Sequence, residues 1–365
     1  MINKKGSARV CPRSFCETHP LDCPADIYAD ETSTEPDPEE SNYPQWEISI
    51  DTVGSELALA GANVTALATV EERPLLFRRS GGKRSYSVYF ADLVAGQIVI
   101  RILELLSRPY NGPTAQMRAG GPNVSQNGYR RNTVDCESNE IEQFDIRSTL
   151  RTTYTGYDMD HTLELQYLQD FAYAAINGRT LSDNAINNPI PFNEMEAYWM
   201  DGQRALPPPS RNITPWTRAK FDGLNSRLYE VIGSKTNRAP FRLLSRDLNN
   251  MKGRIFNMQY DSATGEKLGS PNPRADNYMR RQIDNTFDAA TGSLEEAQGF
   301  LNALRDVVAV FRYLHDPDVL DAIQRTRWRL REQCQVAEDD VPRNSKGQSP
   351  LLGLTRIFEA FDDDY

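Results

Sequence analysis

Apolar residues recur every three or four positions in several parts of the chain, which is the spacing that gives a helix one apolar face. The longest such stripe is made by Leu294, Ala297, Leu301, Leu304, Val308 and Phe311. Ser293 and Glu296 form a capping box at its start, so a core helix is predicted from that point. A further helix is predicted from Asp316-Pro317 through Leu330.

A shorter apolar stripe and two extended segments complete the regular pattern. Thr214-Pro215 supplies a hydroxyl cap and a first-turn proline for a helix that Gly233 should end. Residues 85–90 place Tyr, Val and Phe at alternate positions, which is typical of a strand. Residues 97–106 are rich in Ile and Leu and predict either a strand or a short helix.

Three segments are predicted along the chain. Residues 1–84 are acidic and rich in Pro and Ser, so we expect a disordered acidic linker with a Cys-rich N-terminal remnant. Residues 85–332 should form an α+β domain, predominantly helical, with a small sheet and long irregular loops at 107–151 and 177–212. Residues 333–365 end in an acidic run and should form a flexible acidic tail.

Composition limits the class of protein. With 365 residues, 39% of them hydrophobic, the chain can bury a sizeable core, and no run of about eighteen apolar residues predicts a membrane span. Glycosylation acceptors at Asn63, Asn123 and Asn212 indicate secretion, and Cys136 and Cys334 could pair in a disulfide. We therefore expect a secreted glycoprotein whose N-terminal signal is absent from this sequence.

Candidate chemistry is concentrated at residues 155–166, where carboxylates surround one of the three histidines. The apolar spacing that follows predicts a helix beginning within a residue or two of His161, with Glu164 on the same face. In one interpretation Asp158 or Asp160 caps this helix and the His161 ring packs at the edge of the core. In the other, the carboxylates and the imidazole bind a divalent metal, or His161 takes a proton from water.

Two family patterns bear on this stretch. Gly156-Tyr157-Asp158-Met159-Asp160 looks like the acidic strand of chitin-cleaving glycoside hydrolases, but the position of the catalytic acid holds Thr162. Without an acid to protonate the leaving oxygen, a chitinase is excluded. The strings YDMDHTLELQYLQDF, LLSRDLNNMKGRIF and VFRYLHDPDVLDAIQRTRWRL resemble the C-terminal region of secreted fungal class V chitinases of the killer-toxin-like type, outside their catalytic barrel.

A second resemblance joins this stretch to residues 241–254, which predict a short buried strand, a turn and a helix start. Asp160-His161, followed by this strand and by Asn249-x-x-Lys252, is similar to the HNH (His-Me finger) nuclease pattern. The resemblance implies that Asp160 and Asn249 hold one divalent cation, that His161 activates water, and that Lys252 lies near phosphate. That family places the histidine on a strand.

Positive charge is concentrated in the same part of the chain. Between Arg211 and Arg254 ten Lys or Arg stand against three acids, although the whole chain carries a formal charge of −10. Such an excess favours phosphate binding, with anionic glycans as a further partner class. A solvated helix face balanced by the acidic linker is the alternative. The candidate nucleic-acid-binding residues are Arg242, Arg246, Lys252 and Arg254.

Two functions follow as hypotheses. The first is a toxin-like nuclease with His161 and Glu164 as catalytic residues and with Mg²⁺ or Mn²⁺ as cofactor, Zn²⁺ being an alternative. It requires the His161 and Asn249 side chains to lie close together. The second is a non-catalytic module that binds cell-wall glycan or a partner protein, because Tyr198, Trp199 and Trp216 could stack on sugars.

Overall fold

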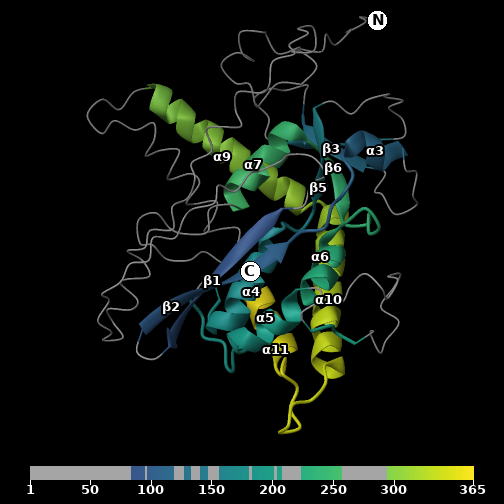
Figure 1. Ribbon diagram of the computed structural model, residues 1–365. Coiled ribbons are helices and arrows are strands. Elements are labelled where there is room, and N and C mark those ends of the chain that lie inside the picture. Colours follow the sequence, from purple (N-terminus) through teal and green to yellow (C-terminus); the bar gives the residue numbers. More distant parts are fainter. Residues whose placement is uncertain are drawn as a thin grey trace, which may run out of the picture.

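The computed structural model describes residues 84–94, 97–118, 127–132, 140–146, 156–180, 183–200, 204–207, 223–256 and 294–365. These residues form two small sheets and eight helices, so the chain mixes helices with strands as predicted (Figure 1). The strands are β1 (Ser85–Val94), β2 (Gln97–Leu106), β3 (Asn127–Arg131), β4 (Ile141–Asp145), β5 (Tyr157–His161) and β6 (Phe241–Ser245). The helices are α3 (Pro113–Arg118), α4 (Gln166–Asn177), α5 (Phe192–Trp199), α6 (Leu224–Ile232), α7 (Arg246–Phe256), α9 (Leu294–Leu314), α10 (Pro317–Asp340) and α11 (Leu354–Asp364).

The first sheet is an antiparallel ribbon of β1 and β2. One of its faces carries Tyr86, Val88, Leu103 and Leu105, which are buried in the largest apolar core together with residues of α4, α5, α6, α10 and α11. The turn end of the ribbon extends beyond the helices at the left of the molecule (Figure 1). Residues 97–106 are therefore a strand, because alternate side chains of β2 are needed in this core.

The second sheet has the strand order β4-β3-β6-β5, with β3 and β6 parallel and the other pairs antiparallel. On one face Leu244 joins a core formed with α7 and α9. On the other face Met159, Phe241 and Leu243 pack with Tyr110 and Ile146. These two faces decide where each polar side chain of β5 can point.

Several predicted helix ends are confirmed. The side chain of Asp316 accepts a hydrogen bond from the backbone N–H of Asp318 at the start of α10. Gly233 ends α6 with φ +144°, a left-handed conformation that favours glycine. Helix α9 begins at Leu294 as expected, but Leu301 and Leu304 are 46% and 37% exposed, so the predicted stripe is only partly a core face.

The predicted flexible tail at 333–365 is wrong. Helix α10 continues to Asp340 and α11 follows it. Cys334, Leu351, Phe358 and Phe361 are buried in the large core, and Asp362 accepts hydrogen bonds from Tyr167 and Arg327. Apolar residues at helical spacing therefore outweigh the acidic end. The loops predicted at 107–151 and 177–212 also contain regular elements, namely α3, β3, β4 and α5.

Other predictions fall outside the described residues. These include the linker up to residue 83, the helix start at Thr214-Pro215, Cys136 and the three glycosylation acceptors. Cys334 is buried, and no disulfide joins it to another residue that the structure describes. Among the described helices, none combines the length and the apolar character that crossing a membrane requires.

Candidate functional site

His161 is the last residue of β5, and α4 begins only at Gln166, so the prediction that His161 lies in the first helical turn is wrong. The position on a strand is the one that the HNH resemblance implies. Because side chains alternate along a strand, Asp158 and Asp160 face α7, whereas Met159 and His161 face the opposite side of the sheet.

Lys252 of α7 connects the acidic groups of this region. Its side chain is fully buried, and its Nζ lies 2.9 and 3.0 Å from the two carboxylate oxygens of Asp160. The same atom lies 2.6 Å from the backbone oxygen of His161 and 2.9 Å from Oε1 of Glu164. An ammonium group has three N–H donors, so these three residues satisfy it completely.

A tyrosine closes this arrangement from α9. The hydroxyl of Tyr313 donates to Oδ2 of Asp160 over 2.6 Å, and Asp160 is only 3% exposed. Lys252, Asp160, Glu164 and Tyr313, named here the Lys252 cluster, therefore join β5, α7 and α9 and the segment before α4. The cluster holds one buried cation and two carboxylates. Removing one charged partner would leave a buried charge unpaired and would lower the stability of the fold.

The Lys252 cluster shifts the pKa values of its members. Burial raises the pKa of Asp160 to about 6; the charge of Lys252 opposes this shift and that of Glu164 adds to it. Burial alone would lower the pKa of Lys252, but the charges of Asp160 and Glu164 outweigh it and the pKa is raised. Burial and the charge of Asp160 raise the pKa of Tyr313. Asp160 can therefore take up a proton near pH 6 while Lys252 stays charged.

A pH dependence of stability follows from Asp160. Because its folded pKa lies above the unfolded value, its contribution is present at acidic pH and is lost as pH rises through about 6. Between pH 7 and pH 5 the native protein should therefore gain about 1 kcal/mol relative to Asp160→Asn. Urea unfolding of both proteins at the two pH values measures this difference, and equal responses would contradict the raised pKa.

The ring of His161 packs on the face of the sheet that points away from α7. Its centroid lies 4.6 Å from that of Tyr110 and 4.5 Å from that of Phe241, and the residue is 6% exposed. A Cβ at Gly233 would lie 3.2 Å from Cδ2 of His161, so a glycine there permits the close approach. Burial, and then the charges of Arg84 and Lys252, hold the pKa of His161 well below its usual value. The ring is therefore neutral, as in the core-packing interpretation.

The predicted metal ligands and the predicted base do not meet at one cation. The ligand Asn249 lies on the α7 side, where its Nδ2 is 3.3 Å from Oδ2 of Asp158, whereas His161, the predicted base, points to the other side of β5. Asp160 already accepts hydrogen bonds from Lys252 and Tyr313. Among the described residues, no three His, Cys, Asp or Glu are grouped as a metal site. Lys252 occupies the place beside Asp160 where the resemblance implies a metal.

The basic segment is partly internal where it is described. Lys252 is fully buried and Arg242 is 4% exposed, with its guanidinium donating to the backbone oxygens of Ala239, Phe241 and Asp318. Their assignment to phosphate contact is therefore wrong for this conformation. Arg246 is exposed and lies 3.5 Å from Asp158. The side chain of Arg254 lies outside the described residues.

The aromatic residues proposed to stack on sugars are also internal. Trp199 is 0% exposed and Tyr198 is 5% exposed, both in the large core. Trp216 lies outside the described residues. Proline-rich surroundings suggested a surface loop, but α5 turns these rings inward. The two described residues therefore offer no face to a glycan.

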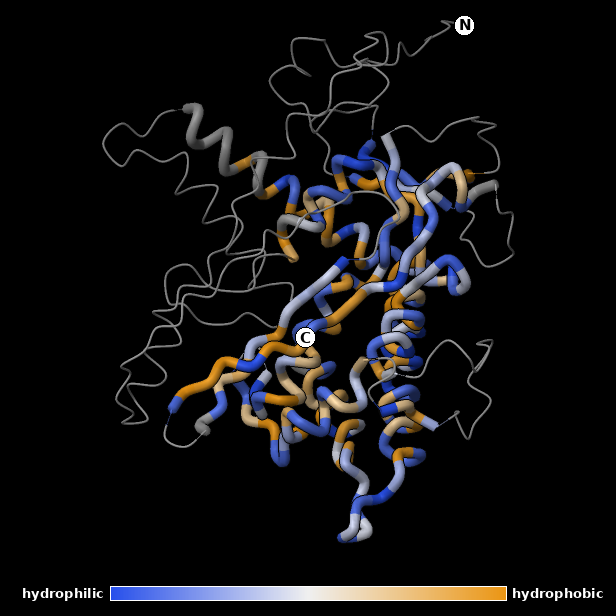
Figure 2. The backbone as a smooth tube through the Cα atoms, viewed as in Figure 1, coloured by the Kyte–Doolittle hydropathy of each residue, from blue (hydrophilic) through white to orange (hydrophobic). Residues whose placement is uncertain are grey.

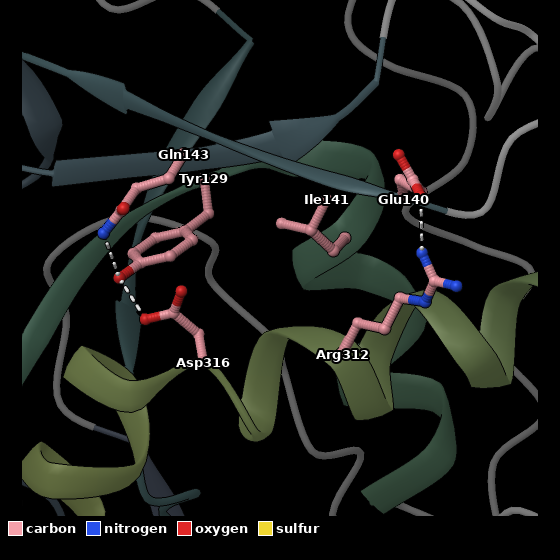
Figure 3. Close-up of a pocket in the computed structure, with 6 residues that line it drawn as sticks. All are labelled: Tyr129, Glu140, Ile141, Gln143, Arg312 and Asp316. Atoms are coloured by element: carbon pink, nitrogen blue, oxygen red, sulfur yellow. Dashed lines mark hydrogen bonds and ion pairs between the residues drawn. The ribbon is translucent and has the colours of Figure 1, made fainter.

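A separate pocket of about 280 Å³ lies beside β4 at the junction of α9 and α10 (Figure 3). It is lined by Tyr129, Glu140, Ile141, Gln143, Arg312 and Asp316. Its polar groups bond one another, because the Tyr129 hydroxyl donates to Asp316 over 2.9 Å and accepts from Gln143 over 3.2 Å. The pocket includes none of the residues that the sequence predicts to be catalytic, metal-binding or nucleic-acid-binding.

The β1–β2 ribbon carries an exposed apolar surface that the sequence-based predictions did not include. Val99, Ile100 and Ile102 are 42%, 37% and 39% exposed, and hydrophobic residues follow the projecting part of the ribbon (Figure 2). Alternating isoleucines in a ten-residue strand were the available signal.

Comparisons of the chain with protein-family models, with curated proteins and with solved structures find no match.

Proposed function

We propose that this chain is a non-catalytic module that binds a partner protein by accepting an extended strand along β2. The observation that carries the proposal is the outer edge of β2, where Ile98, Ile100 and Ile102 combine apolar side chains with outward-facing backbone groups. Strand addition of this kind draws its affinity from main-chain hydrogen bonds and its specificity from alternate side chains.

The direction of the backbone groups follows from two contacts at the base of the ribbon. The side chain of Asn225 donates to the backbone oxygen of Leu106 and accepts from its N–H, at 2.8 and 3.0 Å. Gln169 donates to the backbone oxygen of Ser87. The backbone N–H and C=O groups of Leu106 and Ser87 therefore point away from the other strand of the ribbon. Because residues two apart point the same way, the N–H and C=O groups of Ile98, Ile100 and Ile102 also face outward.

This edge has few of the features that prevent pairing. Natural edge strands are commonly protected by proline, bulges or charged side chains. From Gln97 to Ile102 the pairing with β1 is regular and includes no proline. Arg101, the one charged residue there, is turned to the inner face, where it bonds Glu196 at 2.9 Å and lies over the Phe192 ring. Within the described residues, no third strand pairs with the ribbon.

The groups proposed for catalysis support the non-catalytic part of the proposal. Lys252 forms internal ion pairs with Asp160 and Glu164, and the His161 ring packs against two aromatic rings. The ion pairs have a structural role, because an unpaired charge in the interior destabilises the fold. His161 is 6% exposed, so little of the imidazole is open to water.

Strand binding can be measured with a fluorescein-labelled octapeptide of alternating valine and threonine. Fluorescence anisotropy should show saturable binding to the full chain, weakened at least about tenfold by Ile100→Pro. Proline removes an outward N–H and leaves the bonds between β1 and β2 intact. Ile100→Val keeps the backbone donor and should bind as the native chain does.

The same preparations should cleave neither plasmid DNA nor RNA in Mg²⁺ or Mn²⁺. Nuclease activity that disappears in His161→Ala, without a loss of folded protein, would overturn the non-catalytic assignment. Equal peptide affinity of the native chain and Ile100→Pro would overturn the assignment of β2 as the binding edge.

A further inference from the structure

We infer that the strand accepted by β2 is β2 of a second copy of this chain, paired antiparallel about a two-fold axis at Ile100. The inference rests on the proposed function and names the partner of the same edge. It requires an edge whose backbone and side chains are complementary to themselves, because both copies contribute the same surface to a two-fold interface.

The backbone register meets this requirement. With the axis at Ile100, Ile98 lies opposite Ile102 of the second copy, and Ile100 lies opposite itself. All three residues direct their N–H and C=O groups outward, as the contacts of Leu106 and Ser87 establish. Each opposed pair can therefore exchange both of its N–H···O bonds. A register shifted by one residue would oppose outward groups to inward ones and lose these bonds.

The side chains of β2 are also complementary to those of a second copy. An axis perpendicular to the ribbon keeps the outer face of both copies on the same side, so the three isoleucines of each strand form one continuous apolar row. β-Branched pairs directly opposite each other across strands contribute favourably. On the inner face Val99 lies opposite Arg101 of the second copy, and Arg101 already bonds Glu196 and Asn193 of its own chain. No two like charges are opposed between Ile98 and Ile102.

A second copy fits this edge better than a sugar or a nucleic acid. The surface is apolar and its polar groups are an alternating row of backbone donors and acceptors, which only another strand matches along its length. The pairing covers few residues, well under the roughly 800 Å² per partner of a stable interface, so the dimer should be weak and dependent on concentration.

Sedimentation velocity of the full chain tests self-association directly. From about 1 μM to about 200 μM the native chain should change from monomer to dimer, a range that brackets weak interfaces. Ile100→Pro should raise the dissociation constant at least about tenfold, and Ile100→Val should leave it unchanged. Circular dichroism confirms that each variant is folded. A native chain that stays monomeric throughout, or dimers that persist in Ile100→Pro, would overturn the inference.

Oxidative crosslinking tests the register without removing a hydrogen bond. In the proposed pairing two copies of residue 100 have Cα atoms about 5.5 Å apart, within reach of a disulfide. Ile100→Cys should therefore crosslink to itself, with the bridged peptide identified by mass spectrometry. Two copies of residue 102 would lie about 14 Å apart, so Ile102→Cys should not form its own bridge. Equal crosslinking of both variants would contradict the register.

The outcomes separate the inference from the proposed function. If the valine-threonine peptide binds and Ile100→Pro abolishes this binding, but the native chain never dimerises, the partner is a strand of another protein and only the inference fails. If the peptide does not bind and the chain stays monomeric, both fail.

Discussion

Replacing Lys252 with methionine should lower the free energy of unfolding by about 3–5 kcal/mol, because the substitution leaves two buried carboxylates without their cation. Methionine keeps most of the length of the side chain, so the loss reports the charge more than the packing. Asp160, which is 3% exposed, would keep its hydrogen bond from Tyr313 but lose its cation, and Glu164 would lose its ion pair with Nζ of Lys252. Urea unfolding at pH 7 measures the change.

Lys235→Met is the matched control, because Lys235 is an exposed lysine on the loop after α6. It should change stability by less than about 0.5 kcal/mol. The nuclease hypothesis makes the opposite prediction for Lys252, namely weaker nucleic-acid binding with little change in stability. A Lys252→Met protein as stable as the Lys235→Met protein would contradict the structural assignment of the Lys252 cluster.

His161→Ala should destabilise the protein by about 2–4 kcal/mol, since it leaves a cavity beside two aromatic rings. The ring of His161 contacts those of Tyr110 and Phe241, with centroids 4.6 and 4.5 Å away. Removing Nε2, which has no hydrogen-bond partner within the part of the chain described, should reduce the loss somewhat. The difference in unfolding midpoint and free energy between the native chain and the variant measures this loss.

His315→Ala provides the comparison for this variant. His315 is exposed, and its Nδ1 lies 2.8 Å from the backbone oxygen of Phe311 at the end of α9. Its loss should cost under about 1 kcal/mol. A His161→Ala protein that melts like His315→Ala, with a nuclease activity reduced roughly 10²-fold, would support His161 as a general base instead.

Local signals predicted the elements that depend on nearby residues. The strand at Phe241–Ser245 and the helix at Arg246–Phe256 follow from apolar spacing within one segment. The cap at Asp316 and the glycine at the end of α6 follow from the chemistry of single residues. Beyond residue 333 the acidic composition was misleading, because Leu354, Ile357, Phe358 and Phe361 form a helical stripe that the large core buries.

The candidate site depended on contacts between distant parts of the chain. Asp160 and Lys252 were both singled out from the sequence, but their direct contact joins residues far apart in the chain and turns two separate functional candidates into one ion pair. The helical spacing after Leu163 hid the short strand that ends at His161, since pairing with β6 is what keeps that segment extended. The alternation of side chains along β5 then separates His161 from Asn249.

Strand β5 ends at a histidine and pairs with β6, and α7 packs on the acidic side of this strand pair. Lys252 provides a positive charge from within the fold, so Asp160 and Glu164 have an internal partner, and the proposed binding surface is the edge of β2 instead.

The coupling energy between Asp160 and Lys252 tests the central claim most directly. A double-mutant cycle with Asp160→Asn, Lys252→Met and the combined variant isolates this term from the separate effects of each substitution. If the two residues form the buried ion pair described here, at 2.9 and 3.0 Å, unfolding should give a coupling of about 2–3 kcal/mol. A coupling below about 0.5 kcal/mol, as for exposed pairs, would contradict the account.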